Sequence, residues 1–361
     1  ASRSRGRGAG EPGHIQWEPG LRLGPGGQYV VEKLLGDGAS GRVLGCRDSN
    51  TQFFVAVKVA KPTRRQWRHA QSEAEVLREL ESFDGARYRR FCVRLLDSFV
   101  HAERSMCLVF EPLAVSLRGV LQQAGDSGFL LSDVRAIAWQ LLNCLCFMHA
   151  AGFAHTDLKC TNLMLRDGSF EQVPNPRRPG AWVPRMRQPC EVVVIDFGCA
   201  ADPAKQTGSR VGARHIRAPE VVLGMRWDFS ADLWSFGCVL AVLYTGARLF
   251  RVHEDMEHLA TMERVLEARL PGSMGLQVSE RITSKGVVFD ASGRLVWPGH
   301  AQGTRLVDRV QRAQPLSELV LPRHEALLSL MRGVMEFDPQ VRLTAKAALR
   351  SPFIVSADMT E

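Results

Sequence analysis

Two short stretches of the sequence set polar side chains between apolar runs. In "HTDLKCTN", residues 155–162, these side chains are Asp157, Lys159 and Asn162. In "VVVIDFG", residues 192–198, four apolar β-forming residues lead to Asp196. A carboxylate can accept a proton or bind a divalent cation, an ammonium can neutralise phosphate charge, and an amide oxygen can ligate a metal. Groups of these kinds are the ones that phosphoryl transfer requires.

A glycine-rich stretch lies upstream. "GDGASGRV" spaces Gly36, Gly38, Gly41 and Val43 as GxGxxGxV. Glycines at this spacing let a strand-turn-strand bring backbone N–H groups against phosphates. The pattern alone also fits a plain glycine-rich hairpin. It differs from the dinucleotide-binding fingerprint, because a strand rather than a helix follows it.

A lysine sits at the end of the next apolar strand. "VAVK" ends at Lys58, which Val57 and Val59 flank. An ammonium in such a strand needs an anion to face. Bound phosphates are one candidate, and Glu73, on the apolar face of the following helix, is the other. A lone Lys–Glu pair could be structural, but its place after a glycine-rich loop favours a phosphate site.

The elements that must position these residues fall into two groups. Residues 29–113 read as short strands with one helix, and helices dominate residues 114–353. Residues 1–28 are rich in Gly, Arg and Pro without periodicity, so we expect a flexible extension there. Pro-, Gly- and Arg-rich stretches at about 166–190 and 279–315 are expected to be surface insertions, and 354–361 a short tail.

Composition narrows the class of protein. The 361 residues are 45% hydrophobic and 23% charged, as in ordinary globular proteins. No apolar run reaches the ~18 residues that a membrane span needs. The nine cysteines form no CxxC pair and no metal-ligand spacing, which predicts reduced thiols. The net charge of +8 indicates either an anionic partner or simple solubility.

Taken in order, these motifs and "RAPE" at 217–220 resemble those of eukaryotic protein kinases over residues 29–353. "HTD" and "EHLATMERVLEARLP" at 257–271 resemble the marks of the LAMMER-type (Clk) dual-specificity kinases, with Thr261 in place of Met. The resemblance implies an α+β, bilobal kinase fold, with a small antiparallel-sheet N-lobe and a larger helical C-lobe.

The resemblance also implies roles for individual residues. Asp157 would accept the proton of the substrate hydroxyl, or at least orient that hydroxyl. Lys159 would neutralise charge on the transferred phosphoryl group, and Lys58 paired with Glu73 would position the α- and β-phosphates. Asn162 and Asp196 would bind Mg²⁺. The expected ATP contacts are Leu35, Gly36, Gly38, Gly41, Val43, Ala56, Lys58, Phe110, Glu111, Leu113, Met164 and Ile195.

The implied function is transfer of the γ-phosphoryl group of ATP to Ser and Thr, with possible tyrosine autophosphorylation. Arg/Ser-rich splicing factors are the implied substrates, and the nucleus, the cytoplasm or both the implied location. We expect a monomer without membrane association or direct nucleic-acid binding. An enzyme for Arg-rich peptides should present clustered carboxylates, which contrasts with the charge of +8.

Several positions depart from the kinase pattern. Thr156 replaces the usual Arg, Ala213 replaces a Thr that bonds the catalytic Asp and Lys, and Cys160-Thr161 replace Pro-Glu. Two alternatives therefore stay open: a nucleotide-binding pseudokinase scaffold, and an active kinase of a neighbouring splicing-kinase branch. We expect structural roles for Asp232 and for a buried Glu220–Arg342 pair. Cys199, next to the turn expected to bind metal, could be a reactive thiol or a buried and inert one, and we expect the second.

Overall fold

The computed structural model describes residues 13–205, 210–278, 280–283, 286–299 and 303–356. The chain divides into two compact units. The smaller unit comprises Ala1–Leu113 with Asp196–Gly198, and the larger comprises Ala114–Ile195 with Cys199–Glu361. Among the described residues, no helix combines the length and apolar character needed to cross a bilayer.

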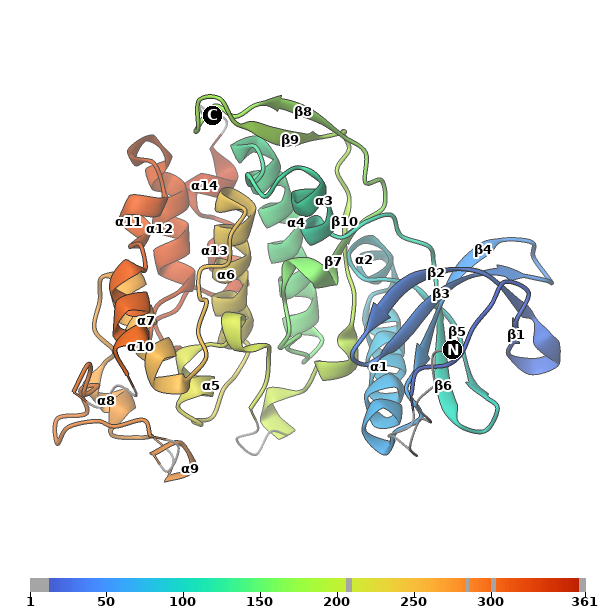
Figure 1. Ribbon diagram of the computed structural model, residues 1–361, viewed down its shortest axis with the longest axis horizontal. Helices are drawn as coiled ribbons and strands as arrows, with labels where there is room; N and C mark the ends of the chain where they lie inside the picture. Colours follow the sequence, from blue (N-terminus) through green and yellow to red (C-terminus); the bar gives the residue numbers. More distant parts are fainter. Residues whose placement is uncertain (1–12, 206–209, 279, 284–285, 300–302, 357–361) are drawn as a thin grey trace, which may run out of the picture. The chain divides into compact units, whose positions relative to one another are not determined.

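The smaller unit is built on a six-stranded antiparallel sheet (Figure 1). Its strand order is β1-β2-β3-β4-β6-β5. The strands are β1 Arg22–Leu23, β2 Tyr29–Gly38, β3 Gly41–Asp48, β4 Phe54–Ala60, β5 Leu95–His101 and β6 Ser105–Phe110. Neighbouring strands pair antiparallel throughout, as the short β-rich runs of the sequence predict.

One long helix, α1 (Arg64–Phe83), packs against strands of this sheet. It begins where the Thr63 hydroxyl accepts a hydrogen bond from the backbone N–H of Gln66. Its buried face has helical spacing and consists of Ala70, Glu73, Ala74, Val76, Leu77 and Leu80. The short α2 (Gly85–Phe91) follows directly, and Asp84 caps it.

The expectation of a flexible extension over 1–28 is wrong for residues 13–28. Residues 1–12 lie outside the described part. Leu23 is fully buried, and Ile15, Trp17 and Leu21 pack against the same apolar cluster on the sheet. The backbone of 20–23 bonds to β2, with Gly20 N–H donating to Val31 O at 2.8 Å. Scattered apolar residues without a period gave no signal of this packing.

The larger unit is mainly helical. Its longer helices are α3 Leu117–Gln123, α4 Leu131–Ala150, α6 Ser230–Thr245, α7 Asp255–Leu266, α10 Thr304–Arg312 and α12 Glu325–Val334. Shorter ones are α5 Pro219–Val222, α8 Gly272–Gly275, α9 Glu280–Thr283, α11 Leu316–Leu319, α13 Ala345–Ala348 and α14 Pro352–Val355. Helix α6 is buried on nearly every side and contacts both α4 and α12, as its all-round apolar sequence predicts.

Two small antiparallel pairs complete this unit. Strand β7 (Leu163–Leu165) follows Asn162 in the sequence, and strand β10 (Val192–Val194) precedes Asp196. The two strands pair with each other. Strands β8 (Phe170–Pro174) and β9 (Trp182–Met186) form a hairpin within 166–190. Within 279–315, α10 buries Leu306 and Val310 and packs against α7.

Candidate active site

The glycine-rich loop joins β2 to β3 in the smaller unit, where Gly38 pairs with Gly41. A Cβ on Gly41 would lie 2.2 Å from the Val59 carbonyl oxygen, so only glycine allows this approach of β3 to β4. Asp37, between the glycines, forms an ion pair with Arg42 at 3.0 Å. The loop is therefore a hairpin of two strands, as the sequence predicts, with its backbone close to the neighbouring strand.

Lys58 on β4 lies at the centre of a charged cluster in the smaller unit. Its Nζ atom is 2.7 Å from Glu73 Oε2 and 2.8 Å from Asp196 Oδ1. Burial opposes the ammonium form, but attraction to both carboxylates outweighs it and raises the pKa of Lys58. Lys58 is thus a fixed cation held between two carboxylates. The structure brings together these three residues, which the sequence singled out separately.

Residues 155–162 of the larger unit, where the resemblance places the catalytic loop, contain Asp157, whose two carboxylate oxygens each accept a hydrogen bond. Lys159 Nζ donates to Oδ2 at 2.5 Å, and the backbone N–H of Ala213 donates to Oδ1 at 3.0 Å. Asn162 Nδ2 donates to the Asp157 backbone carbonyl at 3.0 Å. The expected trio of Asp157, Lys159 and Asn162 therefore forms one hydrogen-bonded cluster.

Ala213 still contacts Asp157 through its backbone. A threonine hydroxyl is absent at position 213, but the backbone N–H of the same residue bonds the carboxylate. Lys159 occupies the other oxygen. Both carboxylate oxygens are thus bonded, while the bond expected from a Thr hydroxyl to Asp157 and Lys159 is missing.

Asp232 holds the backbone of the catalytic loop through hydrogen bonds. This fully buried carboxylate accepts hydrogen bonds from the backbone N–H groups of His155 and Thr156, both at 2.8 Å. Burial alone would raise its pKa, but the hydrogen bonds and the attraction to His149 and His155 lower the pKa of Asp232. The structural role predicted for Asp232 is confirmed.

Thr156 lacks the guanidinium that kinases usually carry at this position, but its hydroxyl makes a contact of its own. Its Oγ1 donates to the backbone carbonyl of Cys199 at 2.8 Å. Its φ of 66° is unusual for a β-branched residue. The threonine thus fixes the chain just after the "DFG" turn through a hydroxyl group.

The residues expected to bind Mg²⁺ have suitable oxygens, since Mg²⁺ prefers carboxylate and amide oxygen ligands. Asn162 donates its Nδ2 to a backbone carbonyl, which orients the amide and leaves Oδ1 without a bonded donor among the described residues. The Asp196 side chain is 38% exposed. Both groups could therefore hold a divalent cation.

The other residues expected to contact ATP lie on the expected elements. In the smaller unit, Phe110 on β6 is buried and pairs with Ala56 on β4, and Glu111 and Leu113 follow it. Leu35 and Val43 lie on β2 and β3. In the larger unit, Met164 lies on β7, and Ile195 N–H donates to Asn162 O at 3.0 Å.

Other predictions at the edge of this site have mixed outcomes. Arg342 and Glu220 form the predicted buried pair through two bonds of 2.8 and 2.9 Å. Cys199, expected to be buried, is exposed. Cys199 lies beyond the end of the apolar strand that precedes Asp196. The hydropathy pattern of that strand therefore could not indicate whether the Cys199 side chain is buried or exposed.

Sequence reasoning missed a group of basic residues beside the catalytic loop. Arg118, His215 and Arg248 line a cavity together with Lys159. They come from three separate segments of the chain, so no local pattern could have joined them. The replacement of Pro-Glu by Cys160-Thr161 was the one signal in the sequence that this region is altered.

Comparison with known proteins agrees with this geometry. The protein kinase domain family matches residues 29–354. Serine/threonine-protein kinase AFC2 of Arabidopsis thaliana is 34% identical over 94% of this chain and 79% of its own length. Human dual specificity protein kinase CLK1 is 34% identical over 95% of this chain and 69% of its own.

A solved crystal structure of a kinase domain superposes with a TM-score of 0.85 at 33% identity. It covers 94% of this chain and 98% of that one. The predicted α+β kinase fold is confirmed. Family match, relatives and fold agree, and the chain belongs to the protein kinase family, in its LAMMER-type group of serine/threonine and dual-specificity kinases.

Proposed function

We propose that this chain is an active kinase that uses ATP and Mg²⁺ to phosphorylate Ser and Thr side chains of proteins. The observation that carries the proposal is the complete set of charged groups in bonded arrangements. One arrangement joins Lys58 to Glu73 and Asp196, and the other joins Asp157 to Lys159 and Asn162. A pseudokinase scaffold would not need all six groups.

Each residue has a defined task in this reaction. Asp157 accepts the proton of the substrate hydroxyl or orients that hydroxyl for attack. Lys159, bonded to Asp157, neutralises charge that accumulates on the transferred group. Lys58 contributes a fixed positive charge for the phosphates. Asn162 and Asp196 would each offer an oxygen to bound Mg²⁺, which would shield the phosphate charges.

The substrate class rests on kinship. Relatives carry the names serine/threonine-protein kinase and dual specificity protein kinase, so Ser and Thr are the first acceptors to test and Tyr the second. Membership of the LAMMER-type group makes Arg/Ser-rich splicing factors the first proteins to test. We place the enzyme in the nucleus, the cytoplasm or both, and expect it to act as a monomer.

The test is turnover of ATP and Mg²⁺ on a Ser peptide with neutral flanks, beside Thr and Tyr versions of that peptide. Wild type should phosphorylate the Ser and Thr peptides. Asp157→Asn should reduce kcat at least a hundredfold, because the hydroxyl loses its general base, while ATP binding persists. ATP binding by wild type without any turnover would favour the scaffold.

A further inference from the structure

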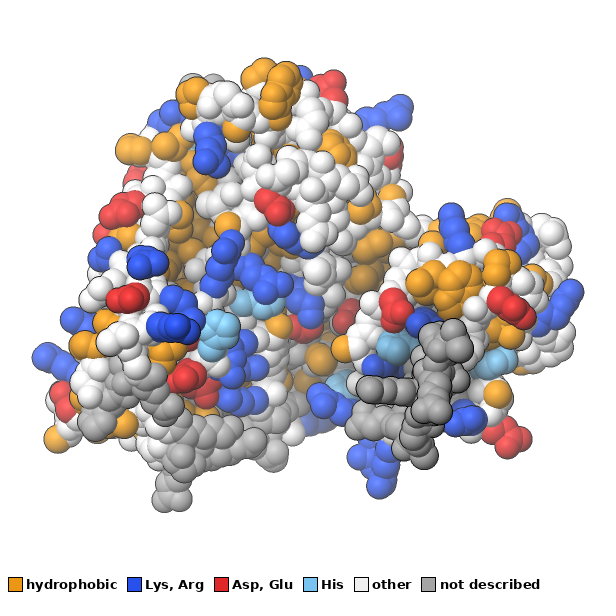
Figure 2. Space-filling view, viewed as in Figure 1, with side chains coloured by type: hydrophobic (Ala, Val, Ile, Leu, Met, Phe, Trp, Pro, Cys, Tyr) orange, Lys and Arg blue, Asp and Glu red, His pale blue; other side chains and the backbone are white. Residues whose placement is uncertain are grey.

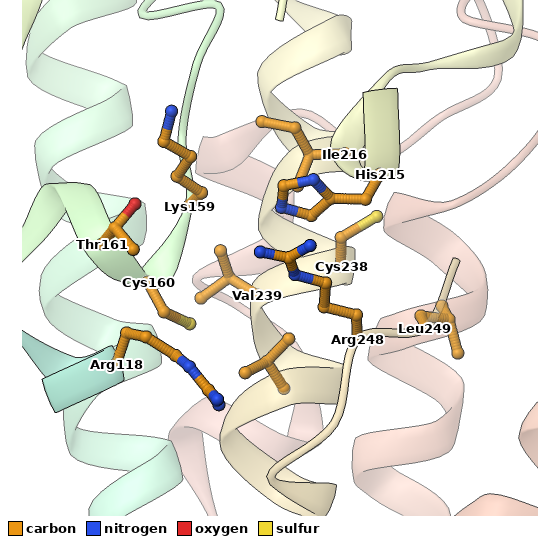
Figure 3. A pocket seen from close by; sticks show the side chains of 11 residues that line it. Arg118, Lys159, Cys160, Thr161, His215, Ile216, Cys238, Val239, Arg248 and Leu249 are labelled. Atoms are coloured by element: carbon orange, nitrogen blue, oxygen red, sulfur yellow. The ribbon is translucent and has the colours of Figure 1, made fainter. Parts of the chain in front are cut away.

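A cavity of about 190 Å³ opens beside the catalytic loop of the larger unit (Figure 3). One water molecule needs roughly 10–15 Å³ on this scale, so the cavity has room for a small side-chain group. Residues from α3, the catalytic loop, the segment before "RAPE", α6 and the chain after α6 line it: Arg118, Lys159, Cys160, Thr161, His215, Ile216, Cys238, Val239, Val242, Arg248 and Leu249.

All formal charges on this lining are positive. Arg118, Lys159 and Arg248 contribute them, and none of the described residues that line the cavity is a carboxylate. Arg118 is balanced by Asp126, with Nη1 2.8 Å from Oδ1. Arg248 is exposed and has no carboxylate within ion-pair distance in the described part of the chain. Its side chain extends into the middle of the cavity in Figure 3.

The positive charges around the cavity also act on His215. Burial first, and then the charges of Arg248 and Lys159, lower the pKa of His215 to about 4, while Asp157 opposes them weakly. The imidazole is therefore neutral at pH 7, and its environment disfavours a further cation. Figure 2 shows Lys and Arg side chains gathered near the middle of the viewed face of the larger unit.

The position of the cavity ties it to substrate binding. Lys159 lines it and also bonds Asp157, the residue that the substrate hydroxyl must approach. A residue one to three positions from the phosphorylated Ser or Thr would therefore pass beside the cavity, since each residue spans up to ~3.5 Å. Thr161, where kinases usually carry Glu, places no carboxylate there for a substrate arginine.

We propose that this cavity binds an anionic side chain flanking the acceptor residue, so that the enzyme prefers acidic or already phosphorylated substrates. A phosphoserine or a carboxylate would pair with Arg248, with Arg118 and Lys159 adding to the field. Unphosphorylated Arg-rich flanks would instead meet like charge. Arg/Ser repeats fit the cavity once neighbouring serines carry phosphate. This inference rests on the proposed kinase activity.

The experiment compares kcat/KM for one Ser peptide with neutral flanks and its variants. Phosphoserine, Glu or Arg replaces one flanking residue at each position from three before to three after the acceptor. At one position the phosphoserine peptide should exceed the neutral one about 10- to 100-fold, as expected for a charge-assisted hydrogen bond. The Glu peptide should show a smaller increase in kcat/KM, and the Arg peptide should show a lower kcat/KM than the neutral one. The two anions separate priming by phosphate from a general acidic preference.

Variants test whether the cavity causes the preference. Arg248→Gln should bring the phosphoserine-to-neutral ratio close to one. Arg251→Gln, a nearby exposed arginine outside the cavity, is the matched control and should keep the ratio. A ratio unchanged in Arg248→Gln, or a preference for Arg flanks, would overturn the assignment while the kinase activity stands.

Direct binding separates the two proposals. If no peptide is phosphorylated, the kinase proposal fails, and fluorescence anisotropy of labelled peptides still tests the cavity. Wild type should bind the phosphoserine peptide at least tenfold more tightly than the neutral one, and Arg248→Gln should lose this difference. Equal affinity of wild type for both peptides would refute the anion site.

Discussion

Thr156 stands where kinases usually carry an arginine, and it holds the neighbouring chain through a hydroxyl instead of a guanidinium. A β-branched residue at positive φ costs roughly 1–3 kcal/mol, and the chain accepts this conformation because two contacts fix it. Asp232 holds the Thr156 N–H, and the Cys199 carbonyl accepts its hydroxyl. The hydroxyl links the catalytic loop to the chain after "DFG" without any phosphate.

Removal of that hydroxyl should be measurable. Thr156→Val keeps the shape and branching but leaves the Cys199 carbonyl without this donor, so the free energy of unfolding should fall by ~1–2 kcal/mol. Thr156→Ser keeps the hydroxyl and should lose less. Urea unfolding of the three proteins provides the comparison. A loss of stability in the Ser variant without a loss in the Val variant would show that the methyl group matters and the hydroxyl does not.

At the scale of elements, most residues of the "EHLATMER" signature on α7 are buried. Glu257 is fully buried, accepts the His253 N–H at 2.7 Å and pairs with Arg309 of α10 at 2.6 Å. Thr261, which departs from the LAMMER pattern, donates its hydroxyl to the Glu257 carbonyl. The signature thus fastens α7 to its neighbours, which explains why it identifies the group without joining the chemistry.

His258 in the same helix should make the protein sensitive to acid. It is fully buried, its ring packs on Phe250, and neither ring nitrogen has a hydrogen-bond partner among the described residues. Burial first, and then the charges of Arg217, Arg214 and Arg210 against that of Asp255, lower the pKa of His258 to about 3. The unfolded chain, with a pKa near 6.5, binds the proton more readily.

Stability from His258 is therefore complete above about pH 6.5 and falls as the pH drops toward 3, by about 2 kcal/mol at pH 5. His258→Leu should remove this part of the pH dependence. Urea unfolding at pH 5 and pH 8 measures it, with His101→Leu in the smaller unit as the control. An unchanged difference between the two pH values in His258→Leu would contradict the assignment.

At the scale of the whole molecule, the family match begins at residue 29, but the packed structure begins earlier. Deletion of residues 1–28 removes Leu23, a fully buried side chain whose burial contributes roughly 2 kcal/mol, and exposes an edge of β2. We expect a lower Tm than for deletion of residues 1–12. Differential scanning calorimetry of both truncations decides, and equal Tm values would mean that residues 13–28 add no stability.

Much of the fold and of the site could be predicted from the sequence, for a physical reason. The strands, α1 and the polar stretches obey local rules of period and spacing, so Lys58, Glu73 and Asp157 could be assigned from the chain alone. Features that depend on distant segments could not be predicted. The packing of residues 13–23 on β2, the N–H of Ala213 on Asp157 and the meeting of Arg118 with Arg248 in one cavity are all of this kind.

The exposure of Cys199 has a consequence for chemical labelling. Of the nine thiols, seven are buried, Cys146 is half-buried, and Cys199 is exposed. Burial raises the pKa of Cys46, Cys107, Cys160 and Cys190 to about 12, which keeps these sulfurs protonated and unreactive. A thiol-reactive electrophile would thus find the most exposed cysteine three residues after Asp196. Alkylation there would attach a probe, or an irreversible inhibitor, beside the proposed metal ligand.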